Sequence, residues 1–206
     1  MRIDAPGAVS PQDHSAYNCT MDVYDFDKTL YRRDSTADFF KHCLRRYPRI
    51  ATTLPRTAIA FGACFGVHAI DKTAFKGSLY RFLRKVPDVL REVRLFWAEH
   101  EQDIAGPCKP QTGDLVISAS PEFLLKEICA KRGLKLIASH VDPHTGRVLG
   151  PNCSGEEKVR RLHQEYPDAS IDRFYSDSIN DTPLALLARE AWQVKGDELI
   201  AWPFGR

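Results

Sequence analysis

The sequence predicts an α/β fold in which a mostly parallel sheet is covered by helices on both faces. From Gly113 to the last strand, short apolar runs of strand length alternate with helical segments, and this alternation is typical of a parallel sheet. Another apolar run, residues 21–24, lies far upstream and is followed by a long helical segment with no strand pattern. We therefore expect a core made of two separate pieces of chain, with an all-helical insertion after the first strand.

Length and composition limit the number of domains and the class of protein. With 206 residues, 43% hydrophobic and 27% charged, the chain is long enough to bury a core and is expected to hold at most two domains. Lys and Arg number 29 against 27 for Asp and Glu, a balance that does not indicate a nucleic-acid partner. The six cysteines have no zinc-site spacing, so we expect reduced thiols. Residues 1–19 lack the apolar stretch of a secretory signal, which predicts a flexible arm and a cytoplasmic protein.

Helical periodicity defines the insertion. Asp34-Ser35-Thr36 offers N-cap residues for a helix that runs from about Ser35 to Tyr47. Two more helices are expected over 58–70 and 71–85. A fourth follows Pro87-Asp88 and presents one apolar face, made of Val89, Val93, Phe96 and Trp97. The predicted division is therefore 20–32 and 112–206 for the core and 33–111 for the helical insertion.

The stretch from Thr57 to Ile70 is almost uncharged and is bounded by Arg56 and Asp71. It is shorter than the roughly 20 apolar residues that a membrane span requires. This length favours a buried helix within the insertion. The alternative is a lipid-facing or interfacial element that would admit a membrane-lipid phosphate, so membrane association is possible but is not the favoured interpretation.

The second piece of the core is expected to contain alternating strands and helices. Strands are expected over 114–118, 134–138, 171–175 and 191–194, with a hairpin over 141–149. Ser120 as N-cap and Pro121 at the first helical position predict a helix to about Arg132. Further helices are expected from Ser154 to Tyr166 and from Thr182 to Arg189.

Polar residues follow several of these strands, and ligands bind beyond the carboxyl ends of the strands in such a sheet. Asp25 and Asp27 come after the first strand, where side chains at i and i+2 point the same way and two carboxylates repel unless a cation lies between them. Taken singly, such residues are often turn or cap residues. The other polar residues at strand or helix ends are Ser118, Lys158, Asp177 and Asp181. The occurrence of all of them in this order indicates a site for an anionic substrate.

These residues resemble the four motifs of the haloacid dehalogenase superfamily: Asp25-x-Asp27-x-Thr29, Ser118 after an apolar strand, Lys158 in Gly155-Glu156-Glu157-Lys158, and Asp177-Ser178-Ile179-Asn180-Asp181. The helical insertion after the first motif resembles the type 1 cap of the phosphoserine phosphatase branch. The resemblance implies a three-layer Rossmann-like core and Mg²⁺-dependent hydrolysis of phosphomonoesters. An alkoxide leaving group needs a proton and a halide does not, so Asp27 favours a phosphatase over a dehalogenase.

The resemblance also implies a role for each residue. Asp25 would be the nucleophile that forms an aspartyl-phosphate, and Asp27 the general acid and then the general base. Asp25, Asp177 and the backbone carbonyl of Asp27 would hold Mg²⁺. Phosphoryl oxygens would be bound by Ser118, the adjacent Ala119 and Lys158. The supporting residues would be Thr29, Ser178, Asn180 and Asp181.

The substrate is less clearly indicated. Asp34 falls where phosphoserine phosphatases carry a substrate-contacting Glu, but it is equally suited to cap the next helix. Segments 136–139, 155–159 and 175–178 are also similar to phosphatidylglycerophosphatase C. We expect a small soluble phosphate ester as substrate, with a membrane-lipid phosphatase or a non-catalytic phosphate-binding protein as alternatives. Retention of both Asp25 and Asp27 argues against the non-catalytic alternative, and the sequence gives no oligomeric state.

Overall fold

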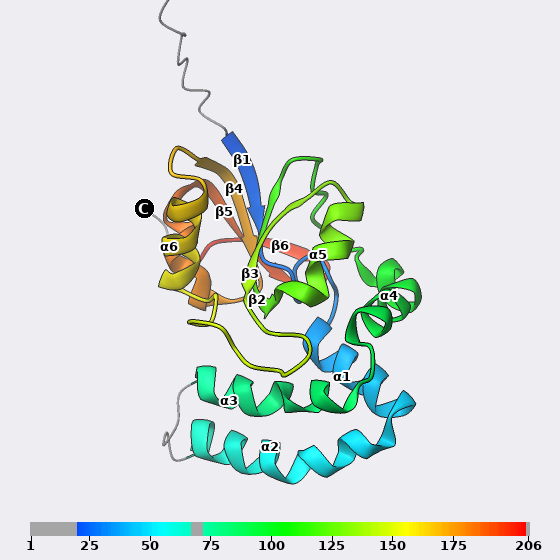
Figure 1. The fold of residues 1–206 in the computed structure, drawn as a ribbon. Helices are drawn as coiled ribbons and strands as arrows, with labels where there is room; N and C mark the ends of the chain where they lie inside the picture. Colours follow the sequence, from blue (N-terminus) through cyan, green and yellow to red (C-terminus); the bar gives the residue numbers. More distant parts are fainter. Residues whose placement is uncertain (1–19, 67–71, 205–206) are drawn as a thin grey trace, which may run out of the picture.

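The computed structural model describes residues 20–66 and 72–204. Within them, one sheet has the strand order β3-β2-β1-β4-β5-β6 (Figure 1). Neighbouring strands are parallel except for β5 and β6, which pair antiparallel. The strands are β1 (Thr20–Tyr24), β2 (Leu115–Pro121), β3 (Lys135–Ser139), β4 (Ser170–Ser176), β5 (Ala188–Lys195) and β6 (Glu198–Ala201).

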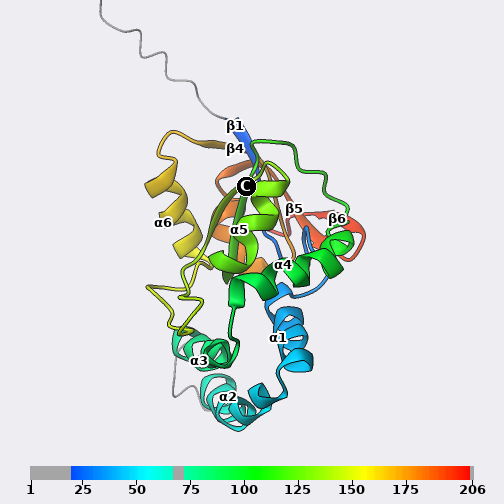
Figure 2. The same cartoon turned by 45° about the vertical axis from the view of Figure 1, so that its right-hand side comes forward.

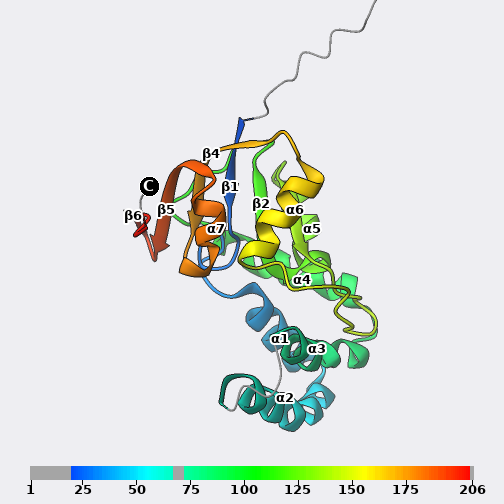
Figure 3. The same ribbon diagram turned by 90° about the vertical axis from the view of Figure 1, so that its left-hand side faces the viewer.

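Helices cover both faces of this sheet, as Figure 3 shows in an edge view. Alternate residues of the central strands enter opposite cores because side chains of a strand alternate in direction. Val116 belongs to the core beneath α4 (Val89–His100) and α5 (Glu122–Lys131), while Ile117 belongs to the core beneath α6 (Glu156–Glu165) and α7 (Thr182–Ala185). The predicted three-layer α/β architecture is confirmed.

Three element predictions for the core are wrong. Strand β2 continues through Pro121, so Ser120 does not cap α5, which begins at Glu122. Helix α7 ends at Ala185, and β5 already begins at Ala188, because Ala188 pairs with Ile171 of β4 and this pairing overrides the helical pattern. The edge strand β6 was not expected, since its side chains are all exposed and give no apolar alternation.

Helices fill the described part of the chain between β1 and β2. The predicted apolar face of α4 is confirmed, with Val89, Val93, Phe96 and Trp97 buried. The division into core and insertion remains our proposal. The remaining elements are α1 (Ser35–Arg46), η1 (Pro48–Thr53), α2 (Leu54–Phe61), η2 (Gly62–Gly66), α3 (Lys72–Leu79), η3 (Tyr80–Lys85) and η4 (Glu101–Asp103).

Helices α2 and α3 lie side by side at the end of the molecule farthest from β1, with α2 outermost (Figures 1 and 2). The prediction of a buried helix over 57–70 is wrong for the residues of α2, none of which is buried. Residues 67–71 lie outside the described residues. No helix in the described part of the chain is both long and apolar enough to cross a bilayer.

The helical segment is held against the core by the loop that follows β3. The hairpin predicted over 141–149 is present as a bridge between Val141 and Val148. At its turn, Gly146 has φ +68°, and a Cβ there would lie 2.1 Å from the carbonyl oxygen of Tyr80. Only glycine permits this approach. The Arg84 guanidinium adds a hydrogen bond of 2.8 Å to the carbonyl of Thr145.

The cysteines agree with the prediction of reduced thiols. Within the described residues each is free and buried: Cys43, Cys64, Cys108, Cys129 and Cys153.

Candidate active site

The candidate site lies at the carboxyl end of the central strand β1. Asp25 follows β1 directly, and its backbone N–H donates to the carbonyl of Tyr175 at 2.8 Å. The chain then turns sharply around the carbonyl of Phe26, which accepts the N–H groups of Leu30 and Tyr31. Lys28, within this turn, has φ +57°, a conformation that non-glycine residues seldom adopt and that is found most often at functional sites.

Lys158 joins two of the predicted motifs. It lies on α6, is 2% exposed, and donates to Asp25 Oδ1 at 2.8 Å and to Asp181 Oδ2 at 2.7 Å. Burial opposes the ammonium charge, but the two carboxylates outweigh it and raise the pKa of Lys158. Burial raises the pKa of Asp25, Lys158 opposes this, and Asp181 adds to it. A cation is thus fixed beside the predicted nucleophile.

Both carboxylate oxygens of Asp27 accept hydrogen bonds. The backbone N–H of Ser35, at the start of α1, donates to Asp27 Oδ1 at 2.7 Å, and the Ser120 hydroxyl donates to Oδ2. Burial, followed by the charge of Asp34, raises the pKa of Asp27 to about 7, and the two hydrogen bonds hold it from rising further. A carboxyl group that titrates near neutrality is suited to general acid and base catalysis.

Asp177 directly follows β4, and it is close enough to Asp25 for the charge of Asp25 to act on it. Burial and the charge of Asp25 raise the pKa of Asp177 to about 6, with Lys28 opposing. Its backbone N–H donates to the Thr29 hydroxyl at 3.1 Å, which ties the loop after β1 to the loop after β4. Next to it, Ser178 forms a local turn by accepting the N–H of Asn180.

The donor set here fits Mg²⁺, a hard cation that prefers oxygen ligands. Three buried or half-buried carboxylates, on Asp25, Asp177 and Asp181, face a single buried ammonium, on Lys158. The expected ligands include only two side chains, Asp25 and Asp177, together with a backbone oxygen. Within the described residues, no group of three His, Cys, Asp or Glu side chains is arranged to hold a metal ion by side chains alone.

Ser118 and Ala119, at the end of β2, lie where the resemblance placed phosphoryl-binding groups. Ser118 is 1% exposed, and its Oγ accepts the N–H of Ser120 at 3.1 Å. The carbonyl of Ala119 accepts a hydrogen bond of 2.7 Å from Lys76 of α3, whose ammonium also donates to Asn152 Oδ1 at 2.6 Å. Lys76 therefore brings a side chain of the helical segment over the site. Burial lowers the pKa of Lys76 to about 8.

A pocket of about 470 Å³ opens beside Asp27, between the core and the helical segment. Asp34 contributes to its wall and also caps α1, accepting the Ala37 N–H at 2.8 Å, so the predicted cap is confirmed. The Tyr80 hydroxyl is buried and has no hydrogen-bond partner within the described part of the chain. The pocket is lined by Asp27, Asp34, Thr36, Ala37, Phe40, Lys41, Lys76, Leu79, Tyr80, Ala119 and Ser120.

The structure therefore brings the predicted residues of all four motifs to one edge of the sheet. Sequence reasoning missed Ser120, Lys76 and Tyr80. A signal for Ser120 was present, because Ser118 and Ser120 are two residues apart on a strand and can share a face. Lys76 and Tyr80 carried no signal, since only the packing of the helical segment onto the core brings them to the pocket.

Comparison with known proteins defines the class. A family model for haloacid dehalogenase-like hydrolases matches residues 23–186, and the chain belongs to this family. Among curated proteins, it is similar to a histidinol-phosphatase of Neisseria meningitidis serogroup C (strain 8013), with 27% identity over 199 residues, 85% of this chain and 90% of the relative.

Among solved structures, the chain resembles a protein of unknown function from Bordetella pertussis Tohama I, with a TM-score of 0.63 at 20% identity, covering 84% of this chain and 89% of the other. It also resembles a probable phosphoserine phosphatase from Vibrio cholerae, with a TM-score of 0.50 at 15% identity, covering 84% of this chain and 55% of the other. At these identities, the likeness to the two structures shows the fold. Together with the family match, it confirms the predicted superfamily.

Proposed function

We propose that the protein is a Mg²⁺-dependent phosphatase that hydrolyses a small phosphate monoester through an aspartyl-phosphate on Asp25. The observation that carries this proposal is the contact of the buried Lys158 with Asp25, at 2.8 Å, beside the separately held Asp27. A nucleophile next to a fixed cation and a carboxyl group poised near neutrality are the parts that phosphoryl transfer from an ester requires.

In the first step, a carboxylate oxygen of Asp25 attacks phosphorus, and the bond from phosphorus to the leaving-group oxygen breaks. Asp27 gives its proton to that oxygen, so the alcohol leaves neutral. Lys158 and the Ser118 hydroxyl are placed to bind phosphoryl oxygens, and the ammonium offsets part of the charge of the incoming phosphate.

In the second step, water attacks the phosphoryl group on Asp25 while Asp27 takes up the proton of the water. The products are inorganic phosphate and the restored carboxylate of Asp25. Asp25, Asp177 and the Asp27 carbonyl would hold Mg²⁺, which supplies charge compensation between carboxylate and phosphate.

The pocket beside Asp27 is proposed to receive the leaving group. Its volume of about 470 Å³ suits a small alcohol, and Phe40 and Leu79 give it apolar wall. Asp34 offers a carboxylate for a substrate amine, and the name of the Neisseria relative makes histidinol phosphate one ester to test. The predicted cytoplasmic location stays a prediction.

Turnover of p-nitrophenyl phosphate with and without Mg²⁺ tests this proposal. We expect metal-dependent hydrolysis that Asp25→Asn abolishes, while Asp172→Asn, a change to a half-buried carboxylate near the other end of β4, leaves it intact. No metal-dependent turnover by the wild type would contradict the proposal. A panel of amino-alcohol, sugar, nucleotide, choline and lipid phosphates then identifies the leaving group.

A further inference from the structure

Helix α2 presents its apolar side chains to solvent. Its half-buried side consists of Thr57 and Ala60, which are three residues apart and therefore neighbours on the helix surface. The exposed apolar residues of the helix, which we call the α2 face, are Leu54 at 41% exposure, Ala58, Ile59 at 73% and Phe61 at 55%. This is the reverse of the usual amphipathic pattern, in which the apolar side of a surface helix packs on the core.

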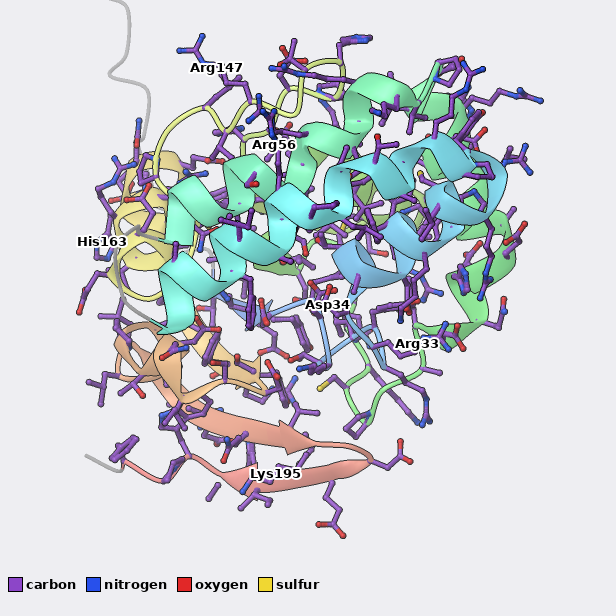
Figure 4. All side chains as sticks on the ribbon, turned by 90° about the horizontal axis from the view of Figure 1, so that it is seen from below. Arg33, Asp34, Arg56, Arg147, His163 and Lys195 are labelled. Atoms are coloured by element: carbon purple, nitrogen blue, oxygen red, sulfur yellow. The ribbon has the colours of Figure 1, made fainter. Side chains whose placement is uncertain are left out.

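The α2 face is located for contact with an external surface. Helix α2 is the outermost layer of the molecule, separated from the sheet by α3 and α1 (Figures 1 and 3). Figure 4 looks directly onto it and shows α2 in front, with Arg56 and Arg147 on one side of the helix. A grouped apolar surface with a charged rim marks an interaction site more often than scattered exposed side chains do.

The segment that contains the α2 face is strongly basic, although one of its lysines, Lys76, lies at the active-site pocket. Residues 48–86 contain seven Lys or Arg and one acidic residue, Asp71, for a net charge of +6, whereas the whole chain carries +2. The rest of the molecule is therefore net negative, and positive charge is concentrated in this segment. Such a distribution favours a negatively charged partner.

Four of these basic residues surround a hollow of about 300 Å³ between α2 and η3. None of the four forms an ion pair with an acidic side chain that the structure describes. Hydroxyl groups complete the lining, which makes the hollow suitable for a phosphate-bearing headgroup. It is lined by Thr52, Thr53, Arg56, Ser78, Arg81, Arg84 and Lys85.

We propose that the α2 face and this basic hollow bind the surface of an anionic lipid bilayer. A bilayer surface matches both features, because apolar side chains enter the acyl boundary while basic side chains contact the headgroups. Nucleic acid would be attracted by the charge but would leave Leu54 and Ile59 in water. A second copy would cover the apolar residues but would bring two basic surfaces together. This binding goes beyond the proposed hydrolysis, which uses the opposite side of the helical segment.

Co-sedimentation of the full chain with vesicles tests the proposal. Vesicles of phosphatidylcholine with roughly 30% phosphatidylglycerol provide the anionic surface, and vesicles of phosphatidylcholine alone provide the neutral one. We expect binding to the anionic vesicles, weaker binding at high salt, and little binding to the neutral vesicles.

Two variants separate the apolar from the basic contribution. Ile59→Ser should weaken vesicle binding about tenfold, since it removes one side chain from the acyl boundary. Arg56→Gln combined with Arg81→Gln should weaken it about fivefold for each arginine. Ile200→Ser on β6 and Lys195→Gln on β5 are matched controls on the other side of the molecule (Figure 4) and should bind as the wild type does.

Circular dichroism verifies that each variant is folded, which keeps this test independent of the proposed activity, and turnover of p-nitrophenyl phosphate should be unchanged in every variant. The proposal is overturned if the wild type fails to bind anionic vesicles, or if it binds neutral vesicles equally well. It is also overturned if the α2 variants bind as tightly as the controls. A dimer in sedimentation analysis that Ile59→Ser dissociates would assign the α2 face to a second copy instead.

Discussion

Two clusters of buried charged residues lie at the carboxyl end of the sheet and in the helical segment. They contain similar residue types but differ in how their charges are balanced. At the sheet, Lys158 contacts Asp25 and Asp181 at 2.8 and 2.7 Å. In the helical segment, the fully buried Glu92 accepts hydrogen bonds from the side chains of His42 and Tyr47 and forms an ion pair with Arg46. The first cluster has more carboxylates than cations, and the second surrounds a single carboxylate with donors.

This difference supports the reactive role that we propose for the first cluster and a structural role for the second. Glu92 has a donor within 3.1 Å on each side of its carboxylate, so burial is compensated and nothing further needs to bind. At the sheet, burial and then the charge of Asp25 raise the pKa of Asp177 to about 6, while burial and the charge of Asp181 raise the pKa of Asp25 against the opposing effect of Lys158. An excess of buried negative charge is costly unless a cation binds, which suits a site that holds Mg²⁺ and a phosphate together.

The largest expected effect is that of Lys158→Met. It removes the cation beside Asp25, and we expect kcat/KM for p-nitrophenyl phosphate to fall at least about 10³-fold. Circular dichroism verifies that the variant is folded. Lys126→Met, an exposed lysine on α5, is the control. A folded Lys158→Met variant that retains more than a tenth of the wild-type kcat/KM would remove Lys158 from the reaction.

Asp27→Asn should lower activity by about 10²-fold on an alkyl phosphate, because the alkoxide then leaves without a proton from the enzyme. The loss in kcat/KM should be much smaller on p-nitrophenyl phosphate, whose leaving group departs readily as an anion. Equal losses on the two esters would show that Asp27 does not act as the general acid.

Glu92→Ala should affect stability and leave chemistry unchanged. It leaves His42 and Tyr47 without their buried partner, and we expect the free energy of unfolding in urea to fall by about 3 kcal/mol. Glu127→Ala, an exposed carboxylate on α5 that lies outside this cluster, should cost less than about 0.5 kcal/mol. If Glu92→Ala instead lowered kcat in protein that is still folded, the contrast between the two clusters would be lost.

The smallest effect is a displacement of the pH profile. A general acid must be protonated, so kcat/KM should fall as pH rises through the Asp27 pKa of about 7. Asp34→Asn keeps a good N-cap but removes a charge that raises this pKa, so the alkaline limb should move to lower pH. Ser120→Ala removes a hydrogen bond that lowers it, so the limb should move to higher pH. Shifts in the same direction for both variants would exclude Asp27 as the titrating group.

The positions of the candidate site residues could be predicted from the sequence because they depend on short-range order along the chain. Asp25 and Asp27 follow an apolar strand, and Asp177 follows another, so a parallel sheet was enough to bring them to one edge. The same holds for Lys158, two residues into α6. Its contacts with Asp25 and Asp181 depend on tertiary packing. Its position near the carboxyl ends of the strands follows from the order of strands and helices along the chain.

Other features depended on tertiary structure. Ser120 is of a residue type that suits an N-cap, yet β2 pairs with β3 again at Pro121, so Ser120 lies in an irregular part of β2 where its hydroxyl donates to Asp27. The apolar pattern of α2 predicted burial, but no element of the described chain covers Leu54 or Ile59. Lys76 reached the pocket only through the packing of α3 against the loop that contains Asn152.

The most direct test of the account is to find the phosphoryl group on Asp25. The enzyme is mixed with Mg²⁺ and a reactive phosphate ester, quenched in acid within one turnover, and digested for mass spectrometry. The account predicts one phosphoryl group on the peptide that contains Asp25, more of it in Asp27→Asn, which hydrolyses the intermediate slowly, and none in Asp25→Asn. Turnover with no phosphorylated peptide, or with the phosphoryl group on another residue, would contradict it.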